Sequence, residues 1–239
     1  MTDKKFTINH EEIQSLLGQL FDEEDIQTIK EVVQMRVVLL RDPILGNDPI
    51  SALYPQRDKI LPLDNKIGGK GIDVLLFGKG KPLMGDYGGS RNTEIYRPLS
   101  YALGRLLFSN PTDPRGSIHM SCEHIENVLK DRLRESTTEN VFELNENASE
   151  EASYQNRDTR SLGILIREIH NKKLLAQDLV GQLWNINTIF RIAKHEYGID
   201  SVKIEEVESV VESRVFNNLE AMSMYFICRK VGTKLLGGS

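Results

Sequence analysis

SLGILIREIHNKKLLAQDLVGQLWNINTIFRIAKHEYG, the stretch from residue 161 to residue 198, decides the fold. Apolar residues recur in steps of three and four along its first part, stop at a polar turn over residues 171–173, and resume with the same spacing until Gly198. This spacing puts apolar side chains on one face of an α-helix, and glycine commonly ends a helix. The stretch therefore predicts two consecutive amphipathic helices, over residues 160–170 and 175–197.

Helical spacing continues on the N-terminal side of this stretch. Residues 93–108 and 117–134 each carry an apolar stripe with steps of three and four. Ser117 is predicted to cap the second of these helices, because its hydroxyl can accept from the free N–H groups of the first turn.

A last helix is predicted on the C-terminal side. It begins after Asn217 or Asn218, has Glu220 near its first turn, and ends at Gly232. Residues 136–158 contain six acidic residues and no sustained apolar period. Such a segment buries too little apolar surface to offset its ordering entropy, which predicts a flexible loop.

The N-terminal third combines several kinds of segment. Residues 11–40 predict two amphipathic helices with a break near residues 22–25. Residues 42–62 contain four prolines, which predict a connecting loop because proline removes a backbone donor and breaks helices. Glycines bracket the short apolar run 72–77, which predicts a β-hairpin or a small sheet.

Together these patterns predict a mainly α fold. Residues 93–236 form a helical bundle with a polar loop at 136–158, and residues 1–92 supply the N-terminal helices, a proline-rich loop and a small glycine-rich β-hairpin.

Composition limits the classes of function. The chain of 239 residues carries a net charge of -5, which disfavours a protein that coats nucleic acid non-specifically. Its longest uncharged apolar stretch, about residues 221–228, is far shorter than the roughly 20 residues that span a bilayer. Cys122 and Cys228 have no CxxC spacing, which indicates buried thiols in a reducing compartment. We expect a cytoplasmic protein without membrane contact.

The stretch 161–198 resembles the closing half of a HEPN domain. In that helical superfamily an "LG-LI" helix precedes an "LL…L…L-IN-I" helix, which ends in Arg-Asn, three residues and His. Here the pattern reads LGILI, LL and NI, and His195 falls on the family's histidine. Phe190 occupies the position of the family's arginine, and Arg191 that of its asparagine. The resemblance covers about residues 94–236.

Active HEPN proteins form dimers in which the arginine and the histidine cleave RNA without metal. The resemblance therefore implies Arg191 and His195 as candidate catalytic residues. Residues four apart share one helical face, with Cβ atoms ~6 Å apart. Arg191 could stabilise charge on a phosphorane while His195 transfers a proton. The alternative is that both residues form a polar helix face or make contacts at the helix end.

A basic segment suggests a surface for RNA. Residues 66–105 carry seven basic and three acidic residues, and we name Lys79, Lys81 and Arg91 as candidate RNA contacts. The lysines do not form a nucleotide-binding Walker loop, because Asp73 stands where that motif needs its first glycine.

No metal site or cofactor is predicted. His119 and His124 are five residues apart, whereas two imidazoles on one helical face are four apart, and the chain contains no HExxH motif.

Two functions remain open at this stage. The first is a HEPN-like non-catalytic interaction or regulatory protein that dimerises or binds a protein partner. The second is a metal-independent endoribonuclease or RNA-binding protein that uses His195 and Arg191, so whether the chain is an enzyme is undecided. The family association is with bacterial or phage-defence and toxin–antitoxin systems.

Overall fold

A computed structural model describes residues 7–41, 49–77, 87–107, 112–138, 160–194 and 216–237. Within these ranges the chain forms nine helices and no strand, which confirms the mainly α class. The helices are α1 (Glu11–Leu20), α2 (Glu23–Arg41), α3 (Pro49–Ile67), α4 (Ile72–Phe77), α5 (Ser90–Leu107), α6 (Pro114–Thr138), α7 (Leu162–Asn171), α8 (Gln177–Lys194) and α10 (Asn218–Leu235).

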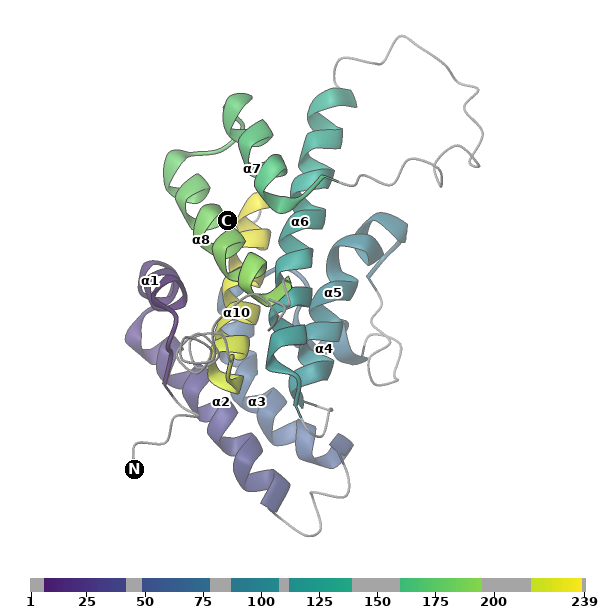
Figure 1. Cartoon of the computed structure of the whole chain (residues 1–239). Helices are drawn as coiled ribbons and strands as arrows, with labels where there is room; N and C mark the ends of the chain where they lie inside the picture. The colour runs from purple at the N-terminus through teal and green to yellow at the C-terminus, as the bar shows by residue number, and fades with distance from the viewer. Residues whose placement is uncertain are drawn as a thin grey trace, which may run out of the picture.

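Helix α10 runs through the middle of the molecule, with α1 and α2 on one side and α5 and α6 on the other (Figure 1). Every residue from 219 to 229 is buried. A helix buried on all sides belongs to the core rather than to an exposed layer. The last helix predicted from the sequence is therefore the central one.

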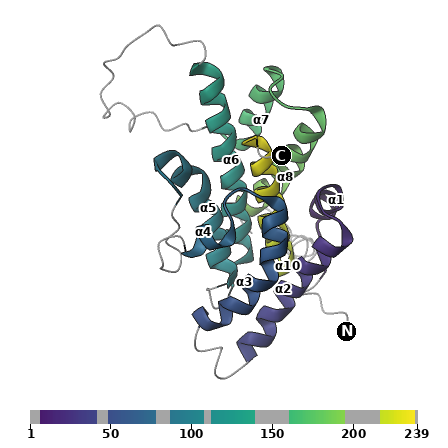
Figure 2. The same ribbon diagram turned by 180° about the vertical axis from the view of Figure 1, so that it is seen from behind.

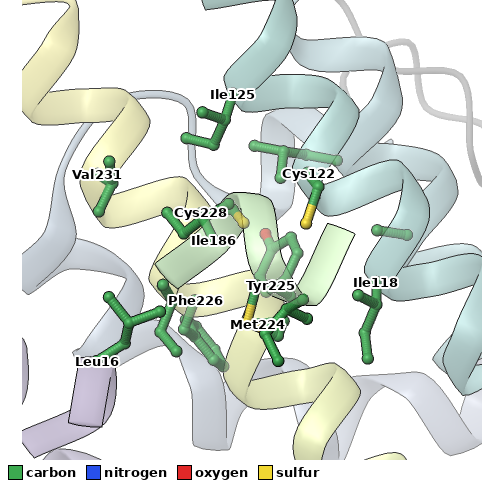
Figure 3. Close-up of a cluster of buried hydrophobic side chains, with 14 of the residues drawn as sticks. Leu16, Ile118, Cys122, Ile125, Ile186, Met224, Tyr225, Phe226, Cys228 and Val231 are labelled. Carbon is green, nitrogen blue, oxygen red and sulfur yellow. The ribbon is translucent and has the colours of Figure 1, made fainter. Parts of the chain in front are cut away.

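One hydrophobic core joins the two ends of the chain. Figure 3 shows Leu16 of α1 and Ile118 of α6 in the same cluster as Phe226 of α10. The domain boundary predicted between residues 92 and 93 lies inside α5, and the helices on both sides of it contribute to this core.

The two cysteines are free and buried in this core, as predicted. Burial and the neighbouring Cys122 thiol raise the pKa of Cys228 well above its usual range. Both side chains lie between α6 and α10 (Figure 3).

The predicted cap of the last helix is present. The Asn217 side chain accepts a hydrogen bond from the backbone N–H of Glu220 at 3.0 Å, and the Glu220 carboxylate accepts one from the backbone N–H of Asn217 at 3.0 Å. This capping box satisfies two N–H groups at the start of α10. The same carboxylate accepts from the Nδ1 of His10 at 2.8 Å, which ties residues before α1 to α10.

The strand predicted over residues 72–77 is wrong: these residues form α4. Asp64 of α3 explains the difference, because its carboxylate accepts from the backbone N–H of Ile72 at 2.7 Å and so satisfies the first turn of α4. Asp64 also forms a buried ion pair with Arg229 of α10. The remainder of the predicted hairpin, residues 78–86, lies outside the described residues.

The loop predicted over residues 42–62 is also wrong where the structure describes it. Helix α3 covers residues 49–67 with Pro55 and Pro62 inside it. Three apolar side chains of this helix pack into the core: Ile60, Leu63 and Ile67. Their burial opposes the loss of backbone hydrogen bonds at the prolines.

Helix α6 starts three residues earlier than predicted, at Pro114. Asp113 caps it, since its carboxylate accepts from the backbone N–H of Gly116 at 2.8 Å. Ser117 is buried inside the helix and is not its cap.

Residues 136–138 of the predicted polar loop belong to the end of α6, and residues 139–159 lie outside the described part. No helix in the described ranges has the length and apolar character that crossing a bilayer requires.

Candidate functional site

Helices α7 and α8 form the pair that the sequence predicted. They lie side by side at one end of the molecule, next to α6 (Figures 1 and 2). Ile166 and Ile169 of α7 and Ile186 and Ile189 of α8 are buried. Helix α8 is described as far as Lys194.

A hollow of about 390 Å³ is lined by the first turn of α7 and by the C-terminal half of α8. We call it the α7–α8 hollow. Its lining contains three cationic side chains and no carboxylate within the described part of the chain. The lining residues are Ser161, Leu162, Gly163, Ile164, Arg167, Trp184, Asn187, Phe190, Arg191 and Lys194.

Two of the cations lie over aromatic rings. The guanidinium carbon of Arg167 is 6.0 Å from the ring centroid of Trp184, and Nζ of Lys194 is 5.3 Å from that of Phe190. Such contacts stabilise a cation without neutralising it. Arg167, Arg191 and Lys194 have no ion pair with any described residue, so the described lining of the hollow is positively charged.

The N-terminus of α7 opens into this hollow. The Ser161 side chain makes no capping hydrogen bond. Its carbonyl oxygen accepts from the N–H groups of Ile164 at 2.9 Å and Leu165 at 3.1 Å. The N–H groups of Leu162 and Gly163 have no acceptor among the described residues, and they add the partial positive charge of a helix N-terminus.

Asn187 is a buried polar residue beside that open end. Its side chain is only 8% exposed and makes no hydrogen bond with any described residue. It lies against Gly163, where an added Cβ would be 3.5 Å from Nδ2 and 3.7 Å from Oδ1 of Asn187. Because Asn187 also lines the hollow, its amide faces that open space. The amide is therefore available to a ligand that enters the hollow.

A second hollow, also of about 390 Å³, lies on the other side of the end of α8. There Nε of Arg115 donates to the carbonyl oxygen of Ala193 at 2.8 Å. The His119 ring packs on Phe190, and burial lowers the pKa of His119, which favours the neutral imidazole near pH 7. Lys194 borders both hollows.

Only one of the two predicted catalytic residues lies in the described part of the chain. Arg191 is exposed on α8 and lines the α7–α8 hollow. His195 follows the last described residue of α8 and lies outside the described part. Their pairing in one site stays a prediction.

The predicted RNA contacts do not lie at this hollow where the structure describes them. Arg91 of α5 donates to both carboxylate oxygens of Asp131 of α6, at 2.8 and 2.6 Å, and also pairs with Glu135. These carboxylates raise the pKa of Arg91 above its usual range. Arg91 therefore holds α5 to α6, and its contact with RNA stays a prediction. Lys79 and Lys81 lie outside the described residues.

Asn187 was not predicted as a site residue, although the sequence carries a signal for it. Asn187 follows Leu183 by four residues, so a polar side chain falls on the apolar stripe of α8. Trp184 of the same helix is half-buried at the hollow.

Comparisons of the chain with models of protein families, with curated proteins and with solved structures find no match. In the part of the chain that the structure describes, no group of three or more His, Cys, Asp or Glu side chains could hold a metal ion. The function is therefore inferred from the α7–α8 hollow and from the HEPN resemblance of residues 161–198.

Proposed function

We propose that the protein is a HEPN-like interaction or regulatory protein that binds a partner at the α7–α8 hollow and does not cleave RNA. The observation that carries this proposal is the burial of Phe190, which stands at the position of the family's arginine and is only 5% exposed. An arginine that stabilises a phosphorane must reach the substrate. Phe190 has neither a charge nor a hydrogen-bond donor, and its ring packs on His119 of α6.

Dimerisation is part of the same proposal. The HEPN resemblance implies a two-fold pair, and closed two-fold dimers are the commonest homo-oligomers. By the same resemblance the protein would act in a bacterial or phage-defence or toxin–antitoxin system, where the partner is a second protein.

A second candidate function is metal-independent RNA cleavage or RNA binding by His195 and Arg191. The observation that favours it is the charge of the α7–α8 hollow, where Arg191 and Lys194 have no carboxylate partner among the described residues. Unpaired cations attract phosphate groups.

Incubation of purified protein with a mixed-sequence RNA in EDTA separates the two functions. We expect no cleavage by the wild-type protein above that of His195→Ala prepared in the same way. Cleavage that is lost in both His195→Ala and Arg191→Ala would establish the second function and refute the first, because general acid–base catalysis alone supplies about 10² to 10⁴-fold.

A further inference from the structure

We propose that the α7–α8 hollow binds an acidic segment of a partner protein, in which a carboxylate enters the hollow and a neighbouring aliphatic side chain packs on its rim. This inference rests on the proposed interaction function and specifies the chemistry of the partner.

The floor of the hollow offers donors for a carboxylate. The free N–H groups of Leu162 and Gly163 stand at the N-terminus of α7, and the amide of Asn187 lies beside them without a partner among the described residues. Anions bind favourably at helix N-termini. A carboxylate at this point would supply the acceptor that Asn187 Nδ2 lacks.

The wall of the hollow adds charge of the right sign. Arg191 lies on the α8 side of the hollow, with Lys194 three residues further along the same helix. A guanidinium matches a carboxylate with two parallel hydrogen bonds. The three cations of the hollow and the absence of a carboxylate from its described lining favour an acidic occupant over a neutral one.

The rim supplies an apolar contact. Ile164 is 46% exposed, although it belongs to the first turn of α7, and Trp184 is half-buried next to the hollow. An aliphatic side chain beside the carboxylate would pack on Ile164, next to the Trp184 ring. A hollow of about 390 Å³ falls within the range of roughly 300 to 1,000 Å³ that is typical of ligand sites.

Two observations favour a peptide over single-stranded nucleic acid. The guanidinium of Arg167 lies over the Trp184 ring, and base stacking requires an open aromatic face. The chain as a whole carries a net charge of -5, which opposes a phosphate backbone with one charge per nucleotide more than a short peptide with one or two carboxylates.

Trp184 provides a direct readout, because it is the one tryptophan of the chain. We would screen an array of N-acetylated hexapeptides that combine Asp or Glu with Leu, Ile or Val, and titrate the strongest binder against the full chain. Trp184 emission should change and saturate, with a dissociation constant below about 1 mM. The matched peptide with Asn or Gln in place of each acid should bind at least tenfold more weakly.

Three variants test whether the contact is at the hollow. Arg191→Glu and Asn187→Leu should each weaken the peptide at least tenfold. Lys172→Glu makes the same charge change as Arg191→Glu at an exposed residue of the turn after α7, outside the hollow, and should bind within twofold of wild type. Circular dichroism of each variant checks that the helices are retained, and Arg191→Glu keeps the test valid if Asn187→Leu unfolds.

The inference is overturned if no acidic peptide changes Trp184 emission in a saturable way, if the amide peptides bind equally well, or if Arg191→Glu and Lys172→Glu lose binding to the same degree. It is also overturned if a ten-residue oligouridylate binds more tightly than every peptide. None of these outcomes alters the RNA-cleavage assay in EDTA. A failed titration without RNA cleavage therefore removes only the acidic partner, whereas RNA cleavage lost in His195→Ala removes the proposed function.

Discussion

The imidazole ring of His119 on α6 packs against the phenyl ring of Phe190 on α8, with 5.2 Å between the ring centroids. Lys194 lies over the same phenyl ring. Phe190 therefore joins α6 to α8 and has a cation beside it, so the position that holds an arginine in the HEPN pattern is a packing position in this chain.

The first prediction concerns this position. Phe190→Arg should lower the free energy of unfolding by about 3 to 5 kcal/mol, because it removes a buried ring and places an unpaired charge near Lys194. Urea denaturation followed by circular dichroism measures the change. Phe190→Leu, which keeps the site apolar, should cost only about 1 kcal/mol. A Phe190→Arg protein as stable as wild type would show that the ring does not support the packing of α6 on α8.

The second prediction is a dependence of stability on pH that arises from His124. Its Nδ1 donates to the carbonyl oxygen of Ile95 at 2.7 Å, and burial lowers its pKa to about 4. Below pH 6.5 the unfolded chain takes up a proton at this residue and the folded chain does not. Stability should therefore fall as the pH drops from 6.5 to about 4, by roughly 3 kcal/mol from this residue.

Titration of the wild-type imidazoles by NMR checks the cause directly, since His124 should stay neutral down to about pH 4. Urea denaturation at several pH values then compares His124→Gln, which should lose this part of the slope, with His170→Gln. His170 is an exposed residue in the last turn of α7, and its replacement controls for the loss of one histidine elsewhere in the chain. Protonation of His124 near pH 6.5 in the folded protein would contradict the prediction.

The third prediction concerns Glu220, which is fully buried and accepts from the backbone N–H groups of Asn9 and Asn217 and from the His10 ring. Hydrogen bonds from these groups lower its pKa although burial raises it. Glu220→Ala should destabilise the protein by about 3 kcal/mol or more, because it leaves buried donors without an acceptor. Asn217→Ala removes only the cap and should cost about 1 kcal/mol. Thermal unfolding should rank the two variants in this order, and the reverse order would refute the role of Glu220 as the link to residues 7–10.

The fourth prediction is the oligomeric state. Light scattering on the purified protein should give about twice the 27.2 kDa mass of one chain. A strict monomer at tens of micromolar would argue against the HEPN-like pair and against any site shared between two copies.

The sequence correctly predicted the helices whose own apolar spacing determines how they pack. Helices α7 and α8 and the capping box at Asn217 were predicted because apolar spacing and cap chemistry agree there. The predictions from the sequence were wrong for α3 and α4, where residues far away in the chain stabilise the helix. Asp64 satisfies the first turn of α4, and the core retains α3 as a helix despite Pro55 and Pro62.

The candidate site was predicted only in part, for a related reason. Arg191 followed from the resemblance of residues 161–198, and the structure places it at the α7–α8 hollow. Asn187 and the open N-terminus of α7 form one site because two helices pack together, and no local spacing reports that contact.

The most direct test of the α7–α8 hollow as the binding surface is a ¹H–¹⁵N NMR correlation spectrum of the labelled protein, recorded while the strongest acidic hexapeptide is added. The largest shifts should occur at the backbone N–H groups of Leu162 and Gly163 and at the side-chain amide of Asn187, because these are the donors without described acceptors. If the peptide binds and the resonances of these three groups do not shift, the account is contradicted.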